Sequence, residues 1–365
     1  MLLTNPFAGA FGLDIGDLSL KLVQLSYLHL PFASPRFRVT AIRTATLPPG
    51  YIVNGEIQQP EMVRHKILHL LGRDGVNKPI KSRWVVTALP DPKTFLKLIT
   101  LEIPAEELTE DDVLYQAKRH LPFDLSEAYL DWQIVPEDST ESATAVLIGA
   151  APKVIADSYT YLLESAGLEA LTLEVEAVAI ARTLITRGKT YEGEARALLD
   201  LGATRTGLVI YDRGSLQFAT TLNFSGELLT TALAQELKIG YEQAEKLKIE
   251  HGLYASGPHP RYLKAVTPLA EALAADLQRA FTFYREHFPA GNPIMHLTMC
   301  GGVSHLKNLS SLLSAKLKIS AAPGNAWKNL NHQPVTAEEH QRGAALVTAL
   351  GLALRAAETP VSSAE

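Results

Sequence analysis

The stretch "FGLDIGDLSLKLVQL", residues 11–25, has a close counterpart in "ALLDLGATRTGLVIYD", residues 197–212. Each begins with an apolar strand that ends in Asp-x-Gly, at Asp14 and at Asp200, and continues into a strand that carries Leu-Val eight residues after the Asp. Alternating apolar residues interrupted by a Gly-containing turn predict a β-hairpin. Because the pattern occurs twice, we expect two similar α/β halves that face each other across a cleft.

The composition is that of an ordinary globular protein. The 365 residues are 47% hydrophobic and 20% charged, which allows large buried cores in about two domains. A formal charge of −5 gives no basic field for nucleic acid, and no Lys/Arg cluster of the membrane-surface kind appears. We therefore expect proteins or small ligands as partners, and no nucleic acid.

The single cysteine, Cys300, excludes a disulfide framework and indicates a reducing compartment. We expect it to behave as a small buried hydrophobe. The first residues, "MLLTNPFAGAFG", lack the positive start and the continuous apolar run of a signal peptide. The apolar run at 344–354 is shorter than the roughly 18 residues of a membrane-spanning helix. These features predict a cytoplasmic protein.

The order of predicted elements divides the chain. Strands at 11–16, 19–26, 36–46 and 82–90 and a helix at 59–71 indicate a strand-rich unit, and the polar stretch at 186–195 suits a domain boundary. Further helices are predicted at 106–120, 153–167, 225–252 and 268–288. We expect a first lobe at 1–90 and 168–190, an inserted α+β module at 91–167, a second lobe at 191–355 with a smaller helical part at about 236–292, and a disordered tail at 356–365.

The two Asp-x-Gly turns are candidates for phosphate binding. Gly16 and Gly202 would let backbone N–H groups approach phosphate oxygens, while the carboxylates of Asp14 and Asp200 would hold water bound to Mg²⁺. Lys21 could reach a β-phosphate as a point charge. The alternative is an ordinary turn, because Asp and Gly are among the commonest turn residues. Two functional turns would clasp a triphosphate from both sides.

Three other positions have both a structural and a functional interpretation. Gly301-Gly302 follows a strand and is either a tight turn before a helix or a backbone that lies flat against a base. Glu245 and Lys248 share a helix face and form either an exposed ion pair or a ribose site. Glu176 begins a helix, where the dipole favours an acid, and could orient a water for attack on a γ-phosphate. The sequence has no Walker-type loop, nucleophile elbow or Gly-x-Gly-x-x-Gly.

The order of these features resembles the five-segment nucleotide signature of the actin superfamily. More narrowly, nearly the whole chain resembles the PilM family of type IV pilus assembly proteins. The segments that carry this resemblance are "GLDIG", "LPPGYIVNGEIQQPEMV", "LPFDLSEAYLDWQIV", "SYTYLLESAGLEALTLEVEAVAIAR", "LLDLGATRTGLVIYDRGSLQF", "LQRAFTFYRE" and "CGGVSHLKNLSSLLSAKLKI". The stretch from Leu121 to Val135 is the most specific, because it lies in the inserted module that FtsA and PilM have where actin and MreB carry a different one.

The resemblance implies an α/β, actin-like two-lobed fold of duplicated ribonuclease-H-like halves with an inserted α+β subdomain. It implies ATP and Mg²⁺ as cofactors. It also implies that the first and inserted subdomains receive the N-terminal peptide of a PilN-like membrane protein, that other pilus platform proteins are partners, and that the chain works at the inner membrane. The implied nucleotide-binding residues are Gly16, Ser19, Lys21, Gly202, Ala203, Thr204, Glu245, Lys248, Gly301 and Gly302. The implied catalytic residues are Glu176, Asp14 and Asp200, of which Asp14 and Asp200 act on the metal through water.

The chain departs from the family pattern at three positions. Family members usually have small hydroxyl residues in place of Asp17 and Leu18, and Glu in place of Asp276. A carboxylate about 4 Å from a phosphate charge costs about 4 kcal/mol at a dielectric near 20, so Asp17 would weaken ATP binding unless it points to solvent. A missing hydroxyl donor at Leu18 removes about 1–3 kcal/mol more.

Three functions therefore stay open. The first is an ATP-binding pilus protein with at most weak hydrolysis. The second is a scaffold that has a degenerate nucleotide cleft and docks only a peptide. The third is a filament-forming protein of the FtsA or MreB kind. FtsA itself is disfavoured, because the segment after Arg355 lacks a basic amphipathic membrane helix.

Overall fold

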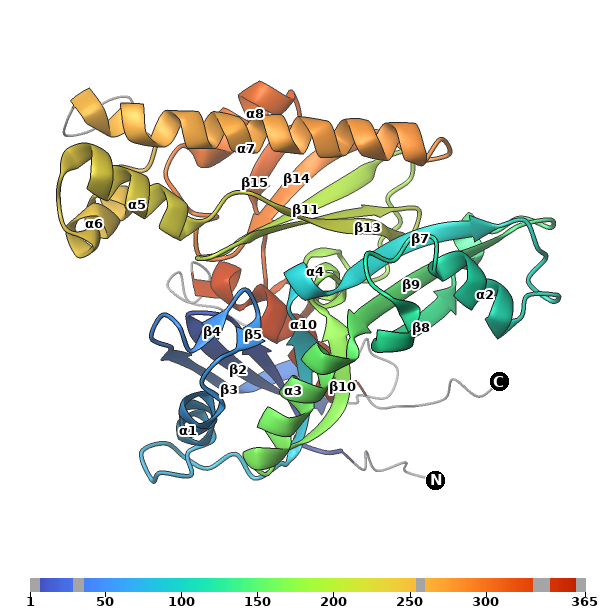
Figure 1. Ribbon diagram of the computed structural model, residues 1–365, viewed down its shortest axis with the longest axis horizontal. Coiled ribbons are helices and arrows are strands. Elements are labelled where there is room, and N and C mark those ends of the chain that lie inside the picture. Colours follow the sequence, from blue (N-terminus) through green and yellow to red (C-terminus); the bar gives the residue numbers. More distant parts are fainter. Residues whose placement is uncertain (1–6, 29–35, 254–259, 331–341, 359–365) are drawn as a thin grey trace. The chain divides into compact units, whose positions relative to one another are not determined.

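The computed structural model describes residues 7–28, 36–253, 260–330 and 342–358 (Figure 1). The chain divides into two compact units. Unit 1 comprises Met1–Arg187, Ala326–Ala337 and Leu346–Glu365, and unit 2 comprises Gly188–Asn325 and Glu338–Ala345. Within the described ranges, no helix is both long and apolar enough to cross a membrane.

Unit 1 contains a five-stranded sheet in the order β10-β6-β1-β2-β3. Its strands are β1 (Phe11–Ile15), β2 (Ser19–Leu28), β3 (Arg36–Thr46), β6 (Trp84–Leu89) and β10 (Glu169–Val175). The first three strands are antiparallel neighbours, whereas β6 and β10 run parallel to β1. Because side chains alternate across a strand, Phe11 and Leu13 pack on one face of the sheet and Gly12 lies on the other.

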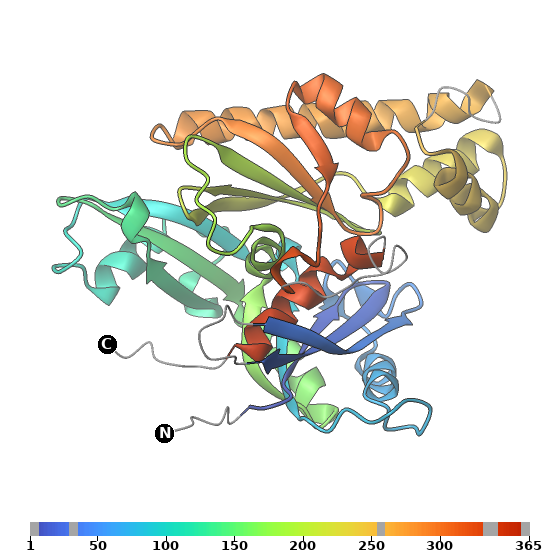
Figure 2. The same ribbon diagram turned by 180° about the vertical axis from the view of Figure 1, so that it is seen from behind.

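Helices cover both faces of this sheet. α1 (Pro60–Leu70) and α3 (Lys153–Ser165) bury apolar side chains in the same core as Phe11 and Leu13. α4 (Glu176–Leu184) and α10 (Val347–Ala357) cover the other face (Figure 2). A Cβ on Gly12 would lie 2.4 Å from the backbone nitrogen of Ala353, so α10 lies against β1 at a distance that only glycine permits.

The position of α10 differs from the lobe boundaries predicted from the sequence, which place it in a second lobe at 191–355. The helix packs in unit 1, and nearly all of its residues are buried. The sequence of α10 is apolar on all sides, which predicts that the helix is buried but does not show which unit it packs against. The helix also continues through Ala357, beyond the predicted start of a disordered tail at 356. Residues 359–365 of that tail lie outside the described residues.

A further strand arrangement in unit 1 has the order β7-β9-β8, with antiparallel pairing of neighbours. Its strands are β7 (Phe95–Leu101), β8 (Ala128–Ile134) and β9 (Thr144–Pro152), and α2 (Glu110–Ala117) packs on it through Val113 and Ala117. α2 begins at a capping box between Thr109 and Asp112, so this helix is shorter than the predicted 106–120. The sequence groups α3 with this module, but in the structure α3 joins the core of the five-stranded sheet.

The remaining elements of unit 1 are short. β4 (Ile52–Val53) and β5 (Glu56–Ile57) form a separate hairpin. Across both units, 3₁₀ turns occupy Asp91–Lys93, Leu125–Glu127, Pro136–Asp138, Lys328–Leu330 and Ala344–Leu346.

Unit 2 has strands in the order β15-β14-β11-β12-β13. These are β11 (Ala195–Leu201), β12 (Thr206–Asp212), β13 (Ser215–Leu222), β14 (Ile294–Cys300) and β15 (Ser320–Pro323). The helices of unit 2 among the described residues include α5 (Gly226–Leu237), α6 (Tyr241–His251), α7 (Pro260–His287) and α8 (Leu309–Leu317). The predicted helix at 225–252 is divided at Lys238, whose φ is 56°. α7 begins before the predicted position 268 and continues through Pro268.

The two five-stranded arrangements have the same topology. β11, β12, β13, β14 and β15 take the places in unit 2 that β1, β2, β3, β6 and β10 take in unit 1, with the same parallel and antiparallel pairings. The turns that follow Asp14 and Asp200 are therefore equivalent. The internal repeat predicted from the sequence is confirmed.

Candidate functional site

The two Asp-x-Gly turns are closed by the same hydrogen bond. In unit 1 the N–H of Gly16 donates to the carbonyl of Ser19 at 3.0 Å, and in unit 2 the N–H of Gly202 donates to the carbonyl of Arg205 at 2.9 Å. A Cβ on Gly202 would lie 2.7 Å from that Arg205 oxygen. The close approach of the Arg205 carbonyl within the turn is thus enough to require a glycine at position 202. Both predicted phosphate-contacting N–H groups are already engaged inside their turns.

Asp14 and Lys21 lie opposite each other on β1 and β2, near the strand ends that flank the first turn. Lys21 Nζ lies 2.8 Å from Asp14 Oδ2, and the side chains are 20% and 9% exposed. The ammonium compensates a carboxylate that is almost removed from water, which would otherwise be costly. The pair places one cation and one anion beside the turn.

Glu176 lies at the same edge of the unit 1 sheet as Asp14. β1, β6 and β10 are parallel, so their carboxyl ends meet at one edge, and Glu176 follows directly after β10. Its side chain is buried and accepts a hydrogen bond from Thr348 Oγ1 of α10 at 3.4 Å. Thr348 is not predicted from the sequence, because its link to Glu176 depends on where α10 packs. Ligand sites in α/β sheets commonly occur at such carboxyl edges.

Asp17 is buried, which excludes one of the two positions that the sequence left open. It does not point to solvent, since it is 5% exposed, and its Oδ1 accepts a hydrogen bond from the backbone N–H of Gly55 at 3.0 Å. The backbone carbonyl of Leu18 accepts from Leu47 at 2.9 Å. The Asp17 carboxylate is therefore bound by the β4–β5 hairpin.

In unit 2, Asp200 lies against the first of the paired glycines. Asp200 pairs with Cys300 across the parallel strands β11 and β14, and the buried Cys300 thiol lies 3.6 Å from Asp200 Oδ1. Gly301 has a φ of +83°, and a Cβ there would lie 2.4 Å from the same Oδ1. Gly302 is exposed, with no atom within 4 Å of its Cβ position. Gly301 is thus required by the fold, whereas Gly302 leaves an open surface.

The start of α5 is bound to the second turn. The N–H of Gly226 donates to the carbonyl of Gly202 at 3.1 Å, and the N–H of Glu227 donates to that of Ala203 at 2.8 Å. A Cβ on Gly226 would meet Val303 at 2.9 Å and lie 3.5 Å from Lys248 Nζ. The second turn, the start of α5 and the loop after β14 therefore meet at one place in unit 2. Ala203 is exposed there and Thr204 is partly exposed.

Lys248 has three acceptors. Its Nζ donates to Gly226 O at 3.1 Å, Thr230 Oγ1 at 2.9 Å and Glu245 Oε2 at 2.6 Å, and the residue is 6% exposed. The hydroxyl of Thr230 also contacts Glu245. An ammonium has three protons, so this arrangement uses all of them. The Glu245 side chain is 37% exposed and is the part of the cluster that solvent reaches.

The sequence predicts that Glu245 and Lys248 lie together but gives no place in this cluster to Gly226 and Thr230, which also bind Lys248. Thr230 follows Gly226 by four residues in α5, and helix geometry places its hydroxyl over that carbonyl, at 2.9 Å. In the sequence, Ser225-Gly226 at a helix start with Thr230 four residues after the glycine is the pattern that indicates this contact.

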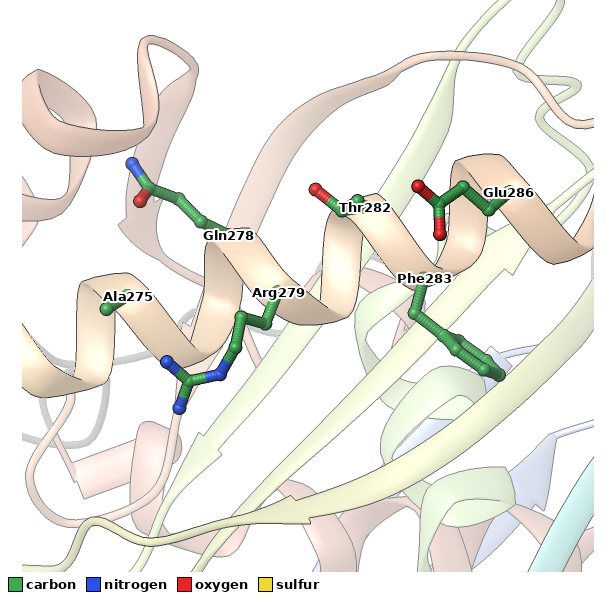
Figure 3. Close-up of a pocket in the computed structure, with 6 residues that line it drawn as sticks. All are labelled: Ala275, Gln278, Arg279, Thr282, Phe283 and Glu286. Carbon is green, nitrogen blue, oxygen red and sulfur yellow. The ribbon is translucent and has the colours of Figure 1, made fainter.

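The surface hollow along α7 contains none of the predicted site residues. It is lined by Ala275, Gln278, Arg279, Thr282, Phe283 and Glu286, all from one helix (Figure 3). Arg279 forms an ion pair with Asp276, the position where the family usually has Glu. This shorter acid is thus used within its own helix.

Each unit contains side chains or backbone of the donor types that a nucleotide or a divalent cation binds. Asp14, Asp200 and Glu176 supply carboxylates, the ligands that Mg²⁺ prefers in proteins. Lys21 supplies a cation, and Gly302 supplies open backbone surface. Among the described residues, no group of three or more His, Cys, Asp or Glu side chains is placed to hold a metal.

The family is shown by comparison with known proteins. A family model described as type IV pilus assembly protein PilM matches residues 12–357. A chain of the solved PilM-PilN type IV pilus biogenesis complex is 28% identical, with a TM-score of 0.81 over 97% of this chain and 100% of that one. The solved ethanolamine utilization protein EutJ from Carboxydothermus hydrogenoformans is 17% identical, with a TM-score of 0.56 over 94% of this chain and 88% of its own, which shows a common fold alone.

Cell division protein FtsA from Enterococcus faecalis is 21% identical over 260 residues, which are 66% of this chain and 57% of FtsA. The chain thus spans little more than half the length of that curated relative. Together with the repeated sheet topology, these similarities confirm the predicted actin-like fold. The match over residues 12–357 shows that the chain belongs to the PilM family of type IV pilus assembly proteins.

Proposed function

We propose that the chain is an actin-like component of the type IV pilus inner-membrane assembly platform and docks the N-terminal peptide of a PilN-like membrane protein. The observation that carries this proposal is the similarity to a chain of a PilM-PilN complex, which extends over 97% of this chain and all of the other. A similarity of that extent leaves no large part of the relative without a counterpart here.

We propose that the peptide binds in unit 1, where the module at 91–167 meets the five-stranded sheet. The chain would then work in the cytoplasm and reach the inner membrane only through PilN-like and other platform proteins. The net charge of −5 supports the absence of a direct attraction to anionic lipid or nucleic acid.

We further propose that the two turns bind ATP with Mg²⁺. When bound, Mg²⁺ would neutralise charge on the phosphates. Asp14 and Asp200 would orient water on the cation, Lys21 would turn from Asp14 toward a phosphate, and Glu176 would accept a proton from a water. Ser19 and Thr204 would complete the two turns. The recurrence of an Asp-x-Gly turn at the same place in the two strand arrangements, and the Lys21 ammonium beside the first turn, support this proposal.

We propose that Glu245 binds the ribose and that Gly302 lies against the base, with Gly301 making the close approach of Asp200 possible. Lys248 has a supporting role in this proposal, because its three protons hold Gly226, Thr230 and Glu245. We expect hydrolysis to be slow, since Glu176 is held by Thr348.

A scaffold without nucleotide is the second candidate. The engaged N–H groups of Gly16 and Gly202 favour it, because a phosphate would find both donors already used. A melting-temperature titration with Mg-ATP separates the two candidates, since a ligand that binds only the folded state raises Tm by mass action. We expect a rise at millimolar Mg-ATP. The absence of any shift would favour the scaffold.

The partner is tested by calorimetric titration of N-terminal peptides of PilN-like proteins into the whole chain, with and without Mg-ATP. The proposal predicts saturable binding at one site. A scrambled peptide of the same composition is the control, and equal heats from the two peptides would remove the pilus function. Electron microscopy with ATP tests the filament alternative, which requires polymers that the proposal does not predict.

A further inference from the structure

Gly55 lies between the first turn and helix α3 and is bonded to both. Its N–H donates to Asp17 Oδ1 at 3.0 Å, and its carbonyl accepts from the hydroxyl of Tyr159 at 3.0 Å. Asp17 belongs to the turn between β1 and β2, and Tyr159 belongs to α3. One residue of the β4–β5 hairpin therefore links two elements that are far apart in the sequence.

The link is buried along its whole length. Asp17 is 5% exposed and Tyr159 is 0% exposed, and Gly55 is buried between them. Water cannot readily replace either hydrogen bond in such a site, so losing one partner leaves a buried polar group unsatisfied. The bond to Asp17 has an ionisable acceptor, which makes it the stronger of the two.

The position of Gly55 is fixed by its neighbours. Gly55 has a φ of +78° and Asn54 has a φ of 49°, which is the turn conformation that favours Asn-Gly in a two-residue hairpin. A Cβ on Gly55 would lie 2.3 Å from Cβ of Pro90, the residue that follows β6. Glu56, the next residue, pairs with Lys93 at 2.5 Å. The hairpin thus has little freedom to move independently of the turn or of α3.

We propose that Asp17, Gly55 and Tyr159 form a bridge through which the first turn and α3 influence each other, with Asp17 as a positioning residue for the turn. The ligands at the two ends rest on the proposed function, namely nucleotide at the turn and partner peptide where the module at 91–167 meets the five-stranded sheet. Through this bridge, binding at either end changes the affinity at the other, and by the same factor in both directions, because coupling between two sites is reciprocal.

The bridge gives Asp17 a role opposite to that of a repulsive charge. If Asp17 only repels phosphate, the variants Asp17→Asn and Asp17→Ala should both have a higher affinity for ATP than the wild type. In the bridge, Asp17→Asn keeps an oxygen that can accept from Gly55, whereas Asp17→Ala removes the acceptor. The two substitutions therefore change the affinity for ATP in opposite directions only if the hydrogen bond from Gly55 positions the turn.

Amide hydrogen exchange tests the bridge without any ligand. Tyr159→Phe removes the hydroxyl and keeps the ring, and Tyr161→Phe is the matched control, because Tyr161 lies on the same helix and is 66% exposed. We expect residues 16–19 and 54–56 to exchange about fivefold faster in Tyr159→Phe, as follows from losing one buried hydrogen bond. The control should match the wild type. Equal exchange in both variants would overturn the bridge.

Substitutions at Asp17 test the bridge from its other end, with amide exchange measured in α3. Asp17→Ala should raise exchange in α3 around Tyr159, and Asp17→Asn should largely restore protection. If Asp17→Ala does not fold, Asp17→Asn compared with the wild type still tests the bridge. Asp17→Asn keeps the oxygen that accepts from Gly55, so faster amide exchange in its α3 would contradict the bridge.

Binding measurements then test the coupling of ligands. In the wild type, Mg-ATP should change the dissociation constant of the PilN-like peptide by at least threefold, and Tyr159→Phe should reduce that factor toward one. Two bound ligands that act independently in the wild type, or a factor unchanged in Tyr159→Phe, would overturn the inference. Failure of the wild type to bind either ligand would instead overturn the proposed function, while the exchange experiment would still decide the bridge.

Discussion

Replacing Lys248 by Met tests whether the cluster that Lys248 forms with Gly226, Thr230 and Glu245 stabilises unit 2. The substitution removes the ammonium and keeps a long unbranched side chain. Three bonds are lost, to Gly226, Thr230 and Glu245, at 3.1, 2.9 and 2.6 Å. A hydrogen bond to a charged group contributes about 1.5–3 kcal/mol.

The three losses do not add. Thr230 still donates to the Gly226 carbonyl at 2.9 Å, and the 37% exposed Glu245 side chain can be rehydrated. We therefore expect a net loss of about 2–3 kcal/mol in the free energy of unfolding, close to the value of one such bond. For a unit of about this size, each 1 kcal/mol moves Tm by about 2–4 °C, so Tm should fall by about 4–12 °C.

The assay is thermal unfolding followed by calorimetry, with Lys246→Met as the matched control. Lys246 lies two residues earlier on α6 and is exposed, so its substitution should move Tm by less than about 2 °C. If Lys248→Met and Lys246→Met melt together within error, the cluster contributes no stability and the supporting role of Lys248 is wrong.

Three further predictions concern packing, pH and the ribose site. Gly351→Ala would place Cβ 1.9 Å from the carbonyl oxygen of Ala179 in α4, so urea unfolding should show a loss of about 3 kcal/mol or more, while Gly240→Ala, with open space around it, should change little. Burial raises the pKa of Tyr262 to about 12, so between pH 10 and 12 the unfolded state releases a proton that the folded state keeps, and stability falls with rising pH. Tyr262→Phe lacks this loss, so its melting temperature should approach or exceed that of the wild type as the pH rises above 10, and parallel curves would contradict the assignment. Glu245→Gln should weaken Mg-ATP binding by about three- to tenfold with a smaller loss of Tm than Lys248→Met, and unchanged affinity would exclude Glu245 from the ribose site.

The repeat was predictable from the sequence because it is local. Asp14 and Asp200 each end a strand before a glycine turn, and the period of two in the flanking residues specifies the hairpins. The corresponding strand order in the two units follows from the same elements recurring in the same sequence. Glu176 was also predictable, since an acid at a helix start after a strand is visible in the sequence.

The roles of Asp17, Lys248 and α10 depend on contacts between distant segments and could not be read from local patterns. Spacing places Lys248 beside Glu245, but it does not show that Gly226 and Thr230, from another helix, take the other two protons. The turn sequence shows an acid at Asp17 without the hairpin that binds it. The glycine that admits α10 is Gly12 on β1, and its meaning appears only once the helix is in place.

Binding of Mg-ATP to Gly302→Val is the most direct test of the nucleotide site. No atom lies within 4 Å of the Cβ position of Gly302, and the residue is exposed, so the side chain should leave the Tm of the protein without nucleotide nearly unchanged. If a base lies on this backbone, the added side chain fills its place. Calorimetric titration should then show one site for Mg-ATP in the wild type and an affinity at least about tenfold weaker in the variant, a difference of about 1.4 kcal/mol. Equal affinities in the two proteins, or no binding by the wild type at millimolar ATP, would contradict the account.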